Sequence, residues 1–466
     1  MIDSAIEVDP ADWRHQDDRA RYALYLGKEG IGKEALAKAN DLAPAGGVWR
    51  NNMNKVMTVL ERDYETVTTP YFALKFHRDE VKVLSRVMAP FLDRSYEEFT
   101  KTYAFRPTTP LVFEVMKRHE EFSVRTMGTL GLGALGVCFG PTVFMDSPSA
   151  QRPGTYNWAG TAHHEIALIF TLLASRGRVP RWLTEGLSSW EEVRRSESWG
   201  RDMESLLDDA LHNDKLFGVR EFDAGFRTSR IIFAYYQGEQ VCRWIEETWG
   251  IEAIRKMLEL FGQDHQIDFV LDKALGLTPE AFDAAFRAFV AKKLEPLKRV
   301  PNWDEDARRG FRLAIAEGRD VEENRLKLAW AWFKAGKSVD SDEVLKPLLD
   351  EGYYEHPLMD LLLGMRALRG KRIQAAKDAF AKVIAAGHDD HDMYYALAQI
   401  AEQEGDDDTA AAMWQKAAAT NPWVTNPQAS PWLALARIAR AAGDQEAWAG
   451  YVARYCGLND TALELR

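Results

Sequence analysis

The last third of the chain repeats itself every 34 residues, and this period limits the possible folds more than any other feature. The residues that recur at this spacing are Gly336 and Gly370, Lys337 and Lys371, Ala376 and Ala410, Phe380 and Trp414, and His388 and Pro422. A unit of this length accommodates two helices, and one helix pair alone cannot bury its apolar face. Neighbouring units must therefore stack, and the sequence predicts an all-α solenoid over residues 306–466.

This period, with its small and aromatic positions, is similar to that of tetratricopeptide repeats. Gly364 and Ala398 occupy the small position of two successive units, and Tyr451 belongs to the last unit. The resemblance implies a concave surface that binds a peptide or protein partner. Tyr394 and Tyr395 are candidates for that contact, with packing between neighbouring helices as the other role for at least one of them.

Residues 1–60 are also expected to form helices. Apolar residues recur at helical spacing over residues 17–44, and Pro44 ends this pattern. Leu36, Ala39 and Pro44 resemble the second helix of a single degenerate tetratricopeptide unit. The N-terminal region is therefore predicted to be helical before the pattern changes.

A second informative stretch, residues 155–195, contains a histidine and a glutamate side by side at His164 and Glu165. In the HExxH pattern, two histidines four residues apart present two nitrogen atoms to one metal ion from the same helix face, and the glutamate acts as a general base. Leu168 stands at the position of the second histidine. Its hydrocarbon side chain cannot bind a metal, so the pattern is incomplete.

The sequence around this motif, HHEIALIFTLLASRGRVPRWLTEGLSSWEE, resembles the gluzincin metallopeptidases, in particular the peptidase MA-like proteins related to aminopeptidase N. In that family a W-x-x-E-G-L/F sequence follows the zinc helix, and here Trp182 and Glu185 match it. The resemblance implies zinc as the cofactor, with His164 and Glu185 as ligands and Glu165 as the base that takes a proton from zinc-bound water. It also implies that Tyr235, in the segment YYQG, donates a hydrogen bond to the transition-state oxyanion.

Leucine at position 168 leaves this zinc site short of one ligand. A catalytic zinc ion needs three protein ligands besides water. His163 is the nearest substitute, but a step of one residue turns its side chain by about 100° around the helix, away from His164 and Leu168. The other histidines lie outside the motif, and the sequence gives no reason to place any of them at the site. Weak zinc binding or none is therefore expected.

Residues 61–300 are predicted to form the gluzincin-like domain, a small mixed sheet followed by a helical subdomain that carries the zinc motif. The expected strands, rich in β-branched and aromatic residues, are residues 66–77, 110–116 and 136–146, and the expected helices are residues 79–103 and 118–126. Further helices are expected from residue 195 to about residue 297, with a linker at residues 298–307. Together with the solenoid, this pattern predicts an α+β protein. In the family, the last strand, here within residues 137–146, pairs with the backbone of an extended substrate.

The composition excludes some partners. The formal net charge is −12, and no block of like charges forms a basic face, so nucleic acid is not an expected partner. The longest weakly polar run, residues 129–140, is too short for a membrane span, which needs about 20 apolar residues. The acidic N-terminus lacks the features of a signal peptide, so the chain is expected either in the cytoplasm or exported with its leader absent.

Three hypotheses of function follow from these patterns. The first is a pseudopeptidase that keeps the peptide cleft of a gluzincin without the metal and uses the repeats to bind a protein partner. The second is a working zinc peptidase that hydrolyses peptide bonds, either with a non-standard ligand or with the second histidine replaced at Leu168. The third treats the gluzincin-like part only as a support for the repeats.

Overall fold

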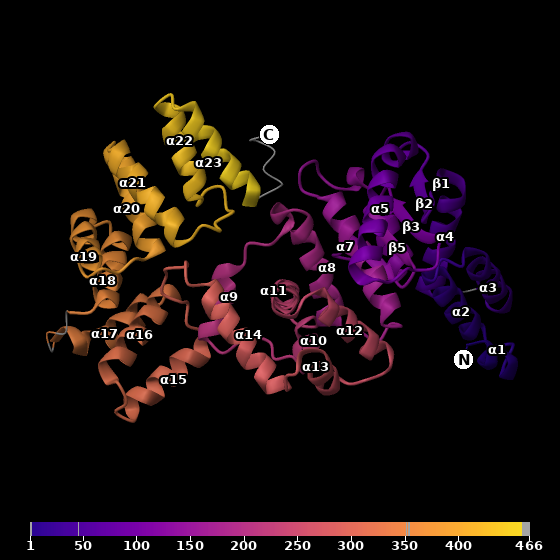
Figure 1. Cartoon of the computed structure of the whole chain (residues 1–466), viewed down its shortest axis with the longest axis horizontal. Helices are drawn as coiled ribbons and strands as arrows, with labels where there is room; N and C mark the ends of the chain where they lie inside the picture. The colour runs from indigo at the N-terminus through magenta and orange to yellow at the C-terminus, as the bar shows by residue number, and fades with distance from the viewer. Residues whose placement is uncertain (1, 45, 351, 353–354, 459–466) are drawn as a thin grey trace.

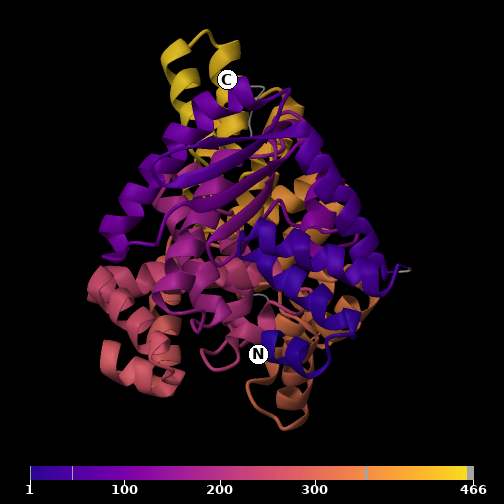
Figure 2. The ribbon, with the colours of Figure 1, turned by 90° about the vertical axis from the view of Figure 1, so that its right-hand side faces the viewer.

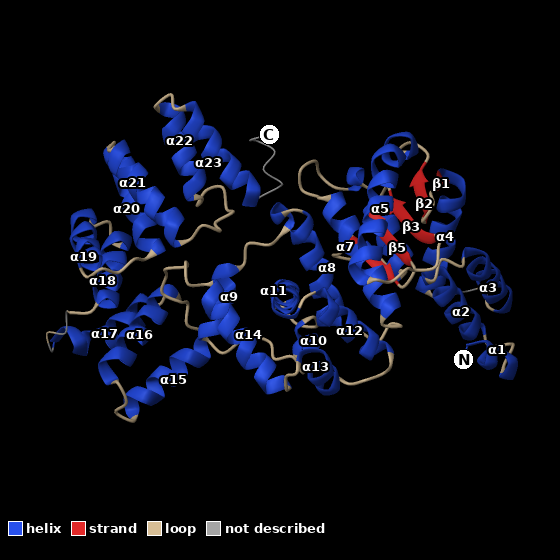
Figure 3. Cartoon of the chain, viewed as in Figure 1, coloured by secondary structure: helices blue, strands red, loops and turns tan. Residues whose placement is uncertain are grey.

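The computed structural model describes residues 2–44, 46–350, 352 and 355–458. Helices dominate this part of the chain, and they surround one five-stranded sheet in its N-terminal half (Figure 3). The predicted α+β class and the small mixed sheet are confirmed. None of the described helices is long and apolar enough to cross a membrane.

The sheet has the strand order β1-β2-β3-β5-β4. The outer pairs, β1 with β2 and β4 with β5, are antiparallel, while β3 is parallel to both of its neighbours. The strands are β1 (Tyr64–Thr68), β2 (Phe72–His77), β3 (Leu111–Met116), β4 (Gly136–Phe139) and β5 (Thr142–Asp146). Parallel neighbours require a long connection, and α5 (Val81–Tyr103) and α6 (His119–Met127) lie in the two connections to and from β3.

Two segments that were expected to be single strands are hairpins. Residues 66–77 form parts of β1 and β2, with the turn around Pro70, and residues 136–146 form β4 and β5, with the turn at Gly140. Gly140 has a φ of 61°, a conformation that glycine adopts readily. Alternation of β-forming residues is the same in one long strand and in two short ones, so the pattern alone did not reveal the turns. As a result, β4 is one of the two edge strands of the sheet, and β1 is the other. We refer to the β4 side as the open edge.

Helices cover both faces of the sheet, which is turned toward the viewer in Figure 2. On one face, Phe72 and Leu74 of β2 pack with α5 and with α7 (Trp158–Ala174) in the largest apolar core. On the other face, Met116 and Phe144 pack with the N-terminal helices and α6. This division follows from the strand period, because successive side chains of a strand point to opposite faces.

The N-terminal helices are α1 (Ile2–Val8), α2 (Trp13–Tyr25), α3 (Glu29–Leu42) and α4 (Val48–Asp63). The helical pattern expected over residues 17–44 is divided between α2 and α3, because the chain turns between them. Gly27 makes this turn with a φ of 69°, and a Cβ atom there would lie 2.7 Å from Cγ2 of Val112. Glycine is thus required both by the backbone conformation and by the close approach to β3.

A buried charge cluster joins the N-terminal helices to the sheet. Glu114, in the middle of β3, is 2 % exposed and accepts a hydrogen bond from Nε of Arg125 over 2.9 Å. Lys75 of β2 lies 3.3 Å from the other side of this carboxylate and 2.7 Å from Glu29 of α3. Arg125 also donates to the backbone oxygen of Leu24 in α2. Because each of these charges has a partner, burying them costs much less free energy than burying unpaired charges would.

A helical region follows the sheet and continues the same apolar core. Its helices after α7 are α8 (Arg181–Arg195), α9 (Glu204–His212), α10 (Phe222–Gly225), α11 (Ile231–Trp249), α12 (Ile251–Gly262), α13 (Ile267–Leu275) and α14 (Pro279–Lys293). Two short 3-10 helices, η1 (Pro148–Ala150) and η2 (Glu197–Trp199), precede α7 and follow α8. α8 and α11 pack closely against each other in the middle of this region.

The C-terminal part consists of helices with a separate apolar core. They are α15 (Glu305–Ala316), α16 (Val321–Lys334), α17 (Ser338–Asp350), α18 (Pro357–Arg369), α19 (Ile373–Ala385), α20 (His391–Glu404), α21 (Asp407–Thr420), α22 (Pro431–Ala441) and α23 (Gln445–Leu458). From α16 onward they pack as consecutive pairs. The recurring small residue explains one of these pairs, since a Cβ atom at Gly364 of α18 would lie 2.4 Å from the Phe380 ring of α19. Tyr394, a candidate for partner contact, is 2 % exposed and belongs to this core, so it packs instead.

The segment that connects the helical region to the C-terminal part is fixed by contacts with both of them. The backbone of Lys298 donates to Thr420 and accepts from His391, and the Arg299 guanidinium pairs with Asp208 of α9. The far end of the C-terminal part returns to the helical region, where α23 contacts η2 (Figure 1). The C-terminal helices therefore arch away from the sheet and close on the helices that follow it.

Candidate functional site

The site is built on α7 and α8, which carry the incomplete zinc motif. Asn157 caps α7 by accepting a hydrogen bond from the Gly160 backbone, and the helix then continues through the motif to Ala174. α8 begins after Pro180, and the carboxylate of Asp223 accepts hydrogen bonds from its first backbone N–H groups. Such caps stabilise helix starts whose N–H groups have no partner within the helix.

A glycine contact brings α8 and α11 unusually close. A Cβ atom at Gly186 would lie 2.6 Å from the backbone of Gly238, and one at Gly238 would lie 3.2 Å from the Gly186 Cα atom. Two larger residues here would force the helices apart. Because the helix axes approach at this point, Glu185 of α8 and Tyr235 of α11 are held on the same side of the contact.

His164 lies between two carboxylates from α8. Its Nδ1 atom is 2.7 Å from Glu192 Oε1, and its Nε2 atom is 3.3 Å from Glu185 Oε2. Burial alone would lower the pKa of His164, but the hydrogen bonds with Glu185 and Glu192 outweigh it and raise the pKa to about 10. At neutral pH, His164 is therefore an imidazolium that donates from both nitrogen atoms.

Glu185 has a second cationic partner. Nε of Arg181, one turn earlier in α8, lies 3.2 Å from Glu185 Oε1, and Nη2 of Arg181 lies 3.5 Å from the Tyr235 hydroxyl. Burial would raise the pKa of Glu185, but the hydrogen bonds and positive charges of His164 and Arg181 lower it. The ring centre of Tyr235 is 6.2 Å from that of His164. The structure thus brings His164, Glu185 and Tyr235 together, with Arg181 among them.

Glu165 points from α7 toward the open edge of the sheet. A Cβ atom at Gly136 of β4 would lie 2.6 Å from Glu165 Oε1, so the strand and this side chain are in close contact. Oε2 of Glu165 is buried without a hydrogen-bond partner among the described residues. Burial raises the pKa of Glu165 to about 8, against the opposing charge of His164. Glu165 is therefore mainly protonated at neutral pH.

The motif supplies two of the three protein ligands that a catalytic zinc ion needs. Leu168, one turn after His164, is 8 % exposed and offers no donor atom, so the expected ligands that remain are His164 and Glu185. Arg181 pairs with Oε1 of Glu185, while Oε2 of Glu185 faces His164. Within the described parts of the chain, no group of three or more His, Cys, Asp or Glu side chains is arranged to hold a metal ion.

His163 does not replace the missing ligand. Its Nδ1 atom lies 3.1 Å from the Ser95 hydroxyl of α5, and its ring is 4.6 Å from that of Phe99. Burial lowers the pKa of His163 to about 3, so it is a neutral core residue. The side chain points away from His164, as the turn of about 100° per residue predicts.

The zinc motif did not single out Glu192 or Arg181, the two further residues that hold this site together. Both could be found from helical spacing on α8. Arg181 precedes Glu185 by one turn, a favourable spacing for an ion pair, and Glu192 follows Glu185 by two turns on the same face. The contact of Gly136 with Glu165 had no such local signal, because it joins two distant segments.

Replacing Glu165 with glutamine is expected to change how stability depends on pH. The folded pKa of about 8 lies above the usual value of 4.5, so the wild-type protein loses stability as pH rises between these values. Glutamine cannot ionise, and between about pH 4 and pH 9 the free energy of unfolding should shift by roughly 4–5 kcal/mol in favour of Glu165→Gln. Urea denaturation at both pH values measures this shift. If the difference in free energy of unfolding between the variant and the wild type is the same at both pH values, Glu165 is not buried in its uncharged form.

No family model, no curated protein and no solved structure matches this chain.

Proposed function

We propose that this protein is a gluzincin-like pseudopeptidase, which binds an extended peptide segment beside β4 but lacks the metal needed to hydrolyse it. The proposal rests above all on one arrangement: His164, Glu165, Glu185 and Tyr235 lie together next to the open edge of the sheet, while Leu168 takes the place of a ligand. The motif resemblance and the mixed sheet with its neighbouring zinc-motif helix support the same reading.

The charges of the site favour binding over hydrolysis. A general base must be ionised near the working pH, and Glu165, with its pKa raised by burial to about 8, is mainly protonated at pH 7. The imidazolium of His164 is held between two carboxylates, where it neutralises them and leaves no free nitrogen lone pair. The polar residues of the motif thus hold one another in a fixed arrangement.

The open edge of β4 suits a peptide in extended conformation. The backbone of Asp146 donates to Leu135, so residues 135, 137 and 139 bond to β5, and the groups of Gly136 and Cys138 point the other way. These N–H and C=O groups can add a further strand to the sheet. A peptide paired there would lie beside Glu165, because Gly136 contacts that side chain.

We propose that the C-terminal helix pairs are tetratricopeptide-like repeats that hold a protein partner near this edge. The packing of Gly364 against Phe380, and the burial of Ala398 and Trp414 at the corresponding positions, support this identity. Since Tyr394 is buried, the partner contact would fall on other residues, among which Tyr395 is partly exposed.

Exchanging Cys138 for proline is expected to weaken peptide binding by about tenfold or more, because it removes an outward N–H group that a bound strand needs. Proline is tolerated at an edge strand where its missing N–H faces away from the sheet. The control is Cys138→Ala, which removes the thiol but keeps the N–H group. Screening a random peptide library on the full-length protein, followed by titration of the selected peptides, measures the effect. Equal binding by the two variants would contradict pairing along β4.

A further inference from the structure

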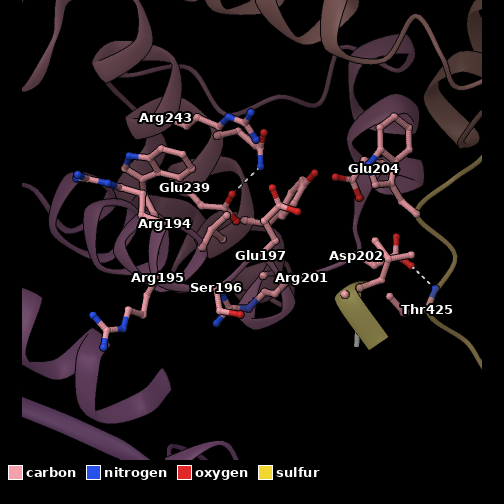
Figure 4. A pocket seen from close by; sticks show the side chains of 18 of the residues that line it. Arg194, Arg195, Ser196, Glu197, Arg201, Asp202, Glu204, Glu239, Arg243 and Thr425 are labelled. Carbon is pink, nitrogen blue, oxygen red and sulfur yellow. Dashed lines mark hydrogen bonds between the residues drawn. The ribbon is translucent and has the colours of Figure 1, made fainter. Parts of the chain in front are cut away.

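A cavity of about 680 Å³ lies next to the candidate site but is separate from it. It is formed by the end of α8, by η2 and α11, and by the segment around Trp423 and Thr425 with the end of α23. Neither His164 nor Glu185 is among its lining residues. The volume falls within the range of small-molecule sites, about 300–1,000 Å³. The cavity is shown from close by in Figure 4.

Most cations that line this cavity are already neutralised. Arg195 and Arg243 pair with Glu98 and Glu247, which lie outside it, and Arg194 pairs with Glu191. In Figure 4, the guanidinium groups of Arg194 and Arg195 point away from the middle of the cavity. An anionic ligand would therefore find little free positive charge there.

The remaining cations also have contacts of their own. Nζ of Lys293 lies 2.9 Å from Glu204 Oε1. Arg201 donates to the Ser189 hydroxyl and lies over the Tyr235 ring, 5.5 Å from its centre. Arg201 is thus drawn toward the neighbouring site and has no carboxylate within 4 Å among the described residues.

Several carboxyl groups of the cavity, by contrast, form no ion pair within 4 Å with a described residue, although the positive charges of Lys293 and Arg201 partly offset the effect of burial on the pKa of Glu239. Glu197 and Asp202 are exposed at its mouth, and Asp202 accepts a hydrogen bond from the backbone N–H of Thr425 over 2.8 Å. Glu239 lies deeper, on α11. Burial raises the pKa of Glu239 to about 8. Even without the charge of Glu239, the carboxylates of Glu197 and Asp202 outnumber Arg201, the one lining cation without an ion pair among the described residues.

Glu239 is the decisive residue, because its side chain is almost fully buried and only one of its carboxylate oxygens accepts a hydrogen bond from a described residue. It is 3 % exposed, and its Oε1 atom accepts a hydrogen bond from Gln240 over 2.8 Å. No hydrogen bond to Oε2 is found among the described residues, and Glu239 is one of the residues that line the cavity. A buried carboxyl group without a partner is unfavourable unless something binds it.

We propose that this cavity binds an alkylammonium group, which donates hydrogen bonds to Oε2 of Glu239. Glu197 and Asp202 at the mouth would attract the positive charge, and the rings of Trp190 and Trp423 in the wall would pack against the alkyl chain. A free amine and the lysine side chain of a peptide both carry this group. The proposal does not depend on peptide binding along β4.

Calorimetric titration of the full-length protein with pentylamine and with 1-pentanol tests the proposal. Pentylamine should bind at least about tenfold more tightly, since only it carries the ammonium group. Glu239→Gln, which keeps the shape of the side chain, should weaken pentylamine binding by about tenfold or more. The matched control is Glu259→Gln on the exposed face of α12, which should bind like wild type.

Two further arms complete the test. Glu197→Gln, at the exposed mouth, should weaken pentylamine binding several-fold even if the Glu239 variant does not fold. If cadaverine binds more tightly than a lysine-containing pentapeptide, the ligand is a free amine. If the pentapeptide binds more tightly, the ligand is the lysine side chain of a peptide. Equal binding of pentylamine and 1-pentanol, unchanged binding by a folded Glu239→Gln protein, or no binding at 10 mM would overturn the proposal.

Discussion

Replacing Leu168 with histidine is expected to create a protein that retains about one zinc ion per chain, where the wild type retains almost none. The new imidazole would stand one helical turn from His164, so two nitrogen atoms and the carboxylate of Glu185 could face one ion. Glu192 is already placed to hold His164 through Nδ1, as outer partners of zinc-bound histidines commonly do. A gain of about a thousandfold in zinc affinity, or roughly 4 kcal/mol, is expected.

Two controls define this experiment. Leu168→Ala also removes the leucine but supplies no ligand, so it should remain free of zinc. Adding Glu185→Gln to the histidine variant should abolish the gained affinity. If Leu168→His folds, as judged by circular dichroism, and still binds no zinc, then His164 and Glu185 are not arranged as remnants of a zinc site.

The substitution Glu114→Ala is expected to lower the free energy of unfolding by about 3–5 kcal/mol. Arg125 is 1 % exposed, and Glu114 is the only carboxylate within 4 Å of its guanidinium among the described residues. Without Glu114, the guanidinium would be a buried charge without a counter-charge, and Lys75 would also lose a partner. Denaturation with urea, followed by the change in tryptophan fluorescence, measures the loss.

The double substitution Glu114→Leu with Arg125→Met is the informative control. It removes both charges and keeps apolar volume in their place, so it should be clearly milder than Glu114→Ala alone. If the free energy of unfolding of Glu114→Ala lies within about 1 kcal/mol of the wild-type value, this charge pair does not hold the N-terminal helices on the sheet.

Local patterns predicted the type of most elements but not where the chain turns. The helix expected at residues 79–103 is α5, and that expected at residues 118–126 is α6, each within a few residues. The turns at Gly27 and Gly140 were missed, because the residues on either side continue the same pattern. The close approach of Gly27 to β3, which requires glycine there, is a tertiary contact and leaves no mark in the local sequence.

The candidate site was predictable to the extent that it lies on single helices. The resemblance to the gluzincin motif implied that His164 lies near Glu185, and spacing along α8 leads from Glu185 to Arg181 and Glu192. The contact of Glu165 with β4 depends on the fold of the sheet. The alkylammonium cavity depends on a junction between Asp202 and Thr425, more than two hundred residues apart, which no local pattern records.

The zinc content of the purified wild-type protein tests the central claim most directly. After dialysis against metal-free buffer, elemental analysis should find less than about 0.1 zinc ion per chain, because two protein ligands are too few to retain the metal. A zinc content close to one ion per chain would contradict the pseudopeptidase proposal. It would mean that a further ligand completes the site at Leu168 and that a zinc-dependent peptidase is the better account of the molecule.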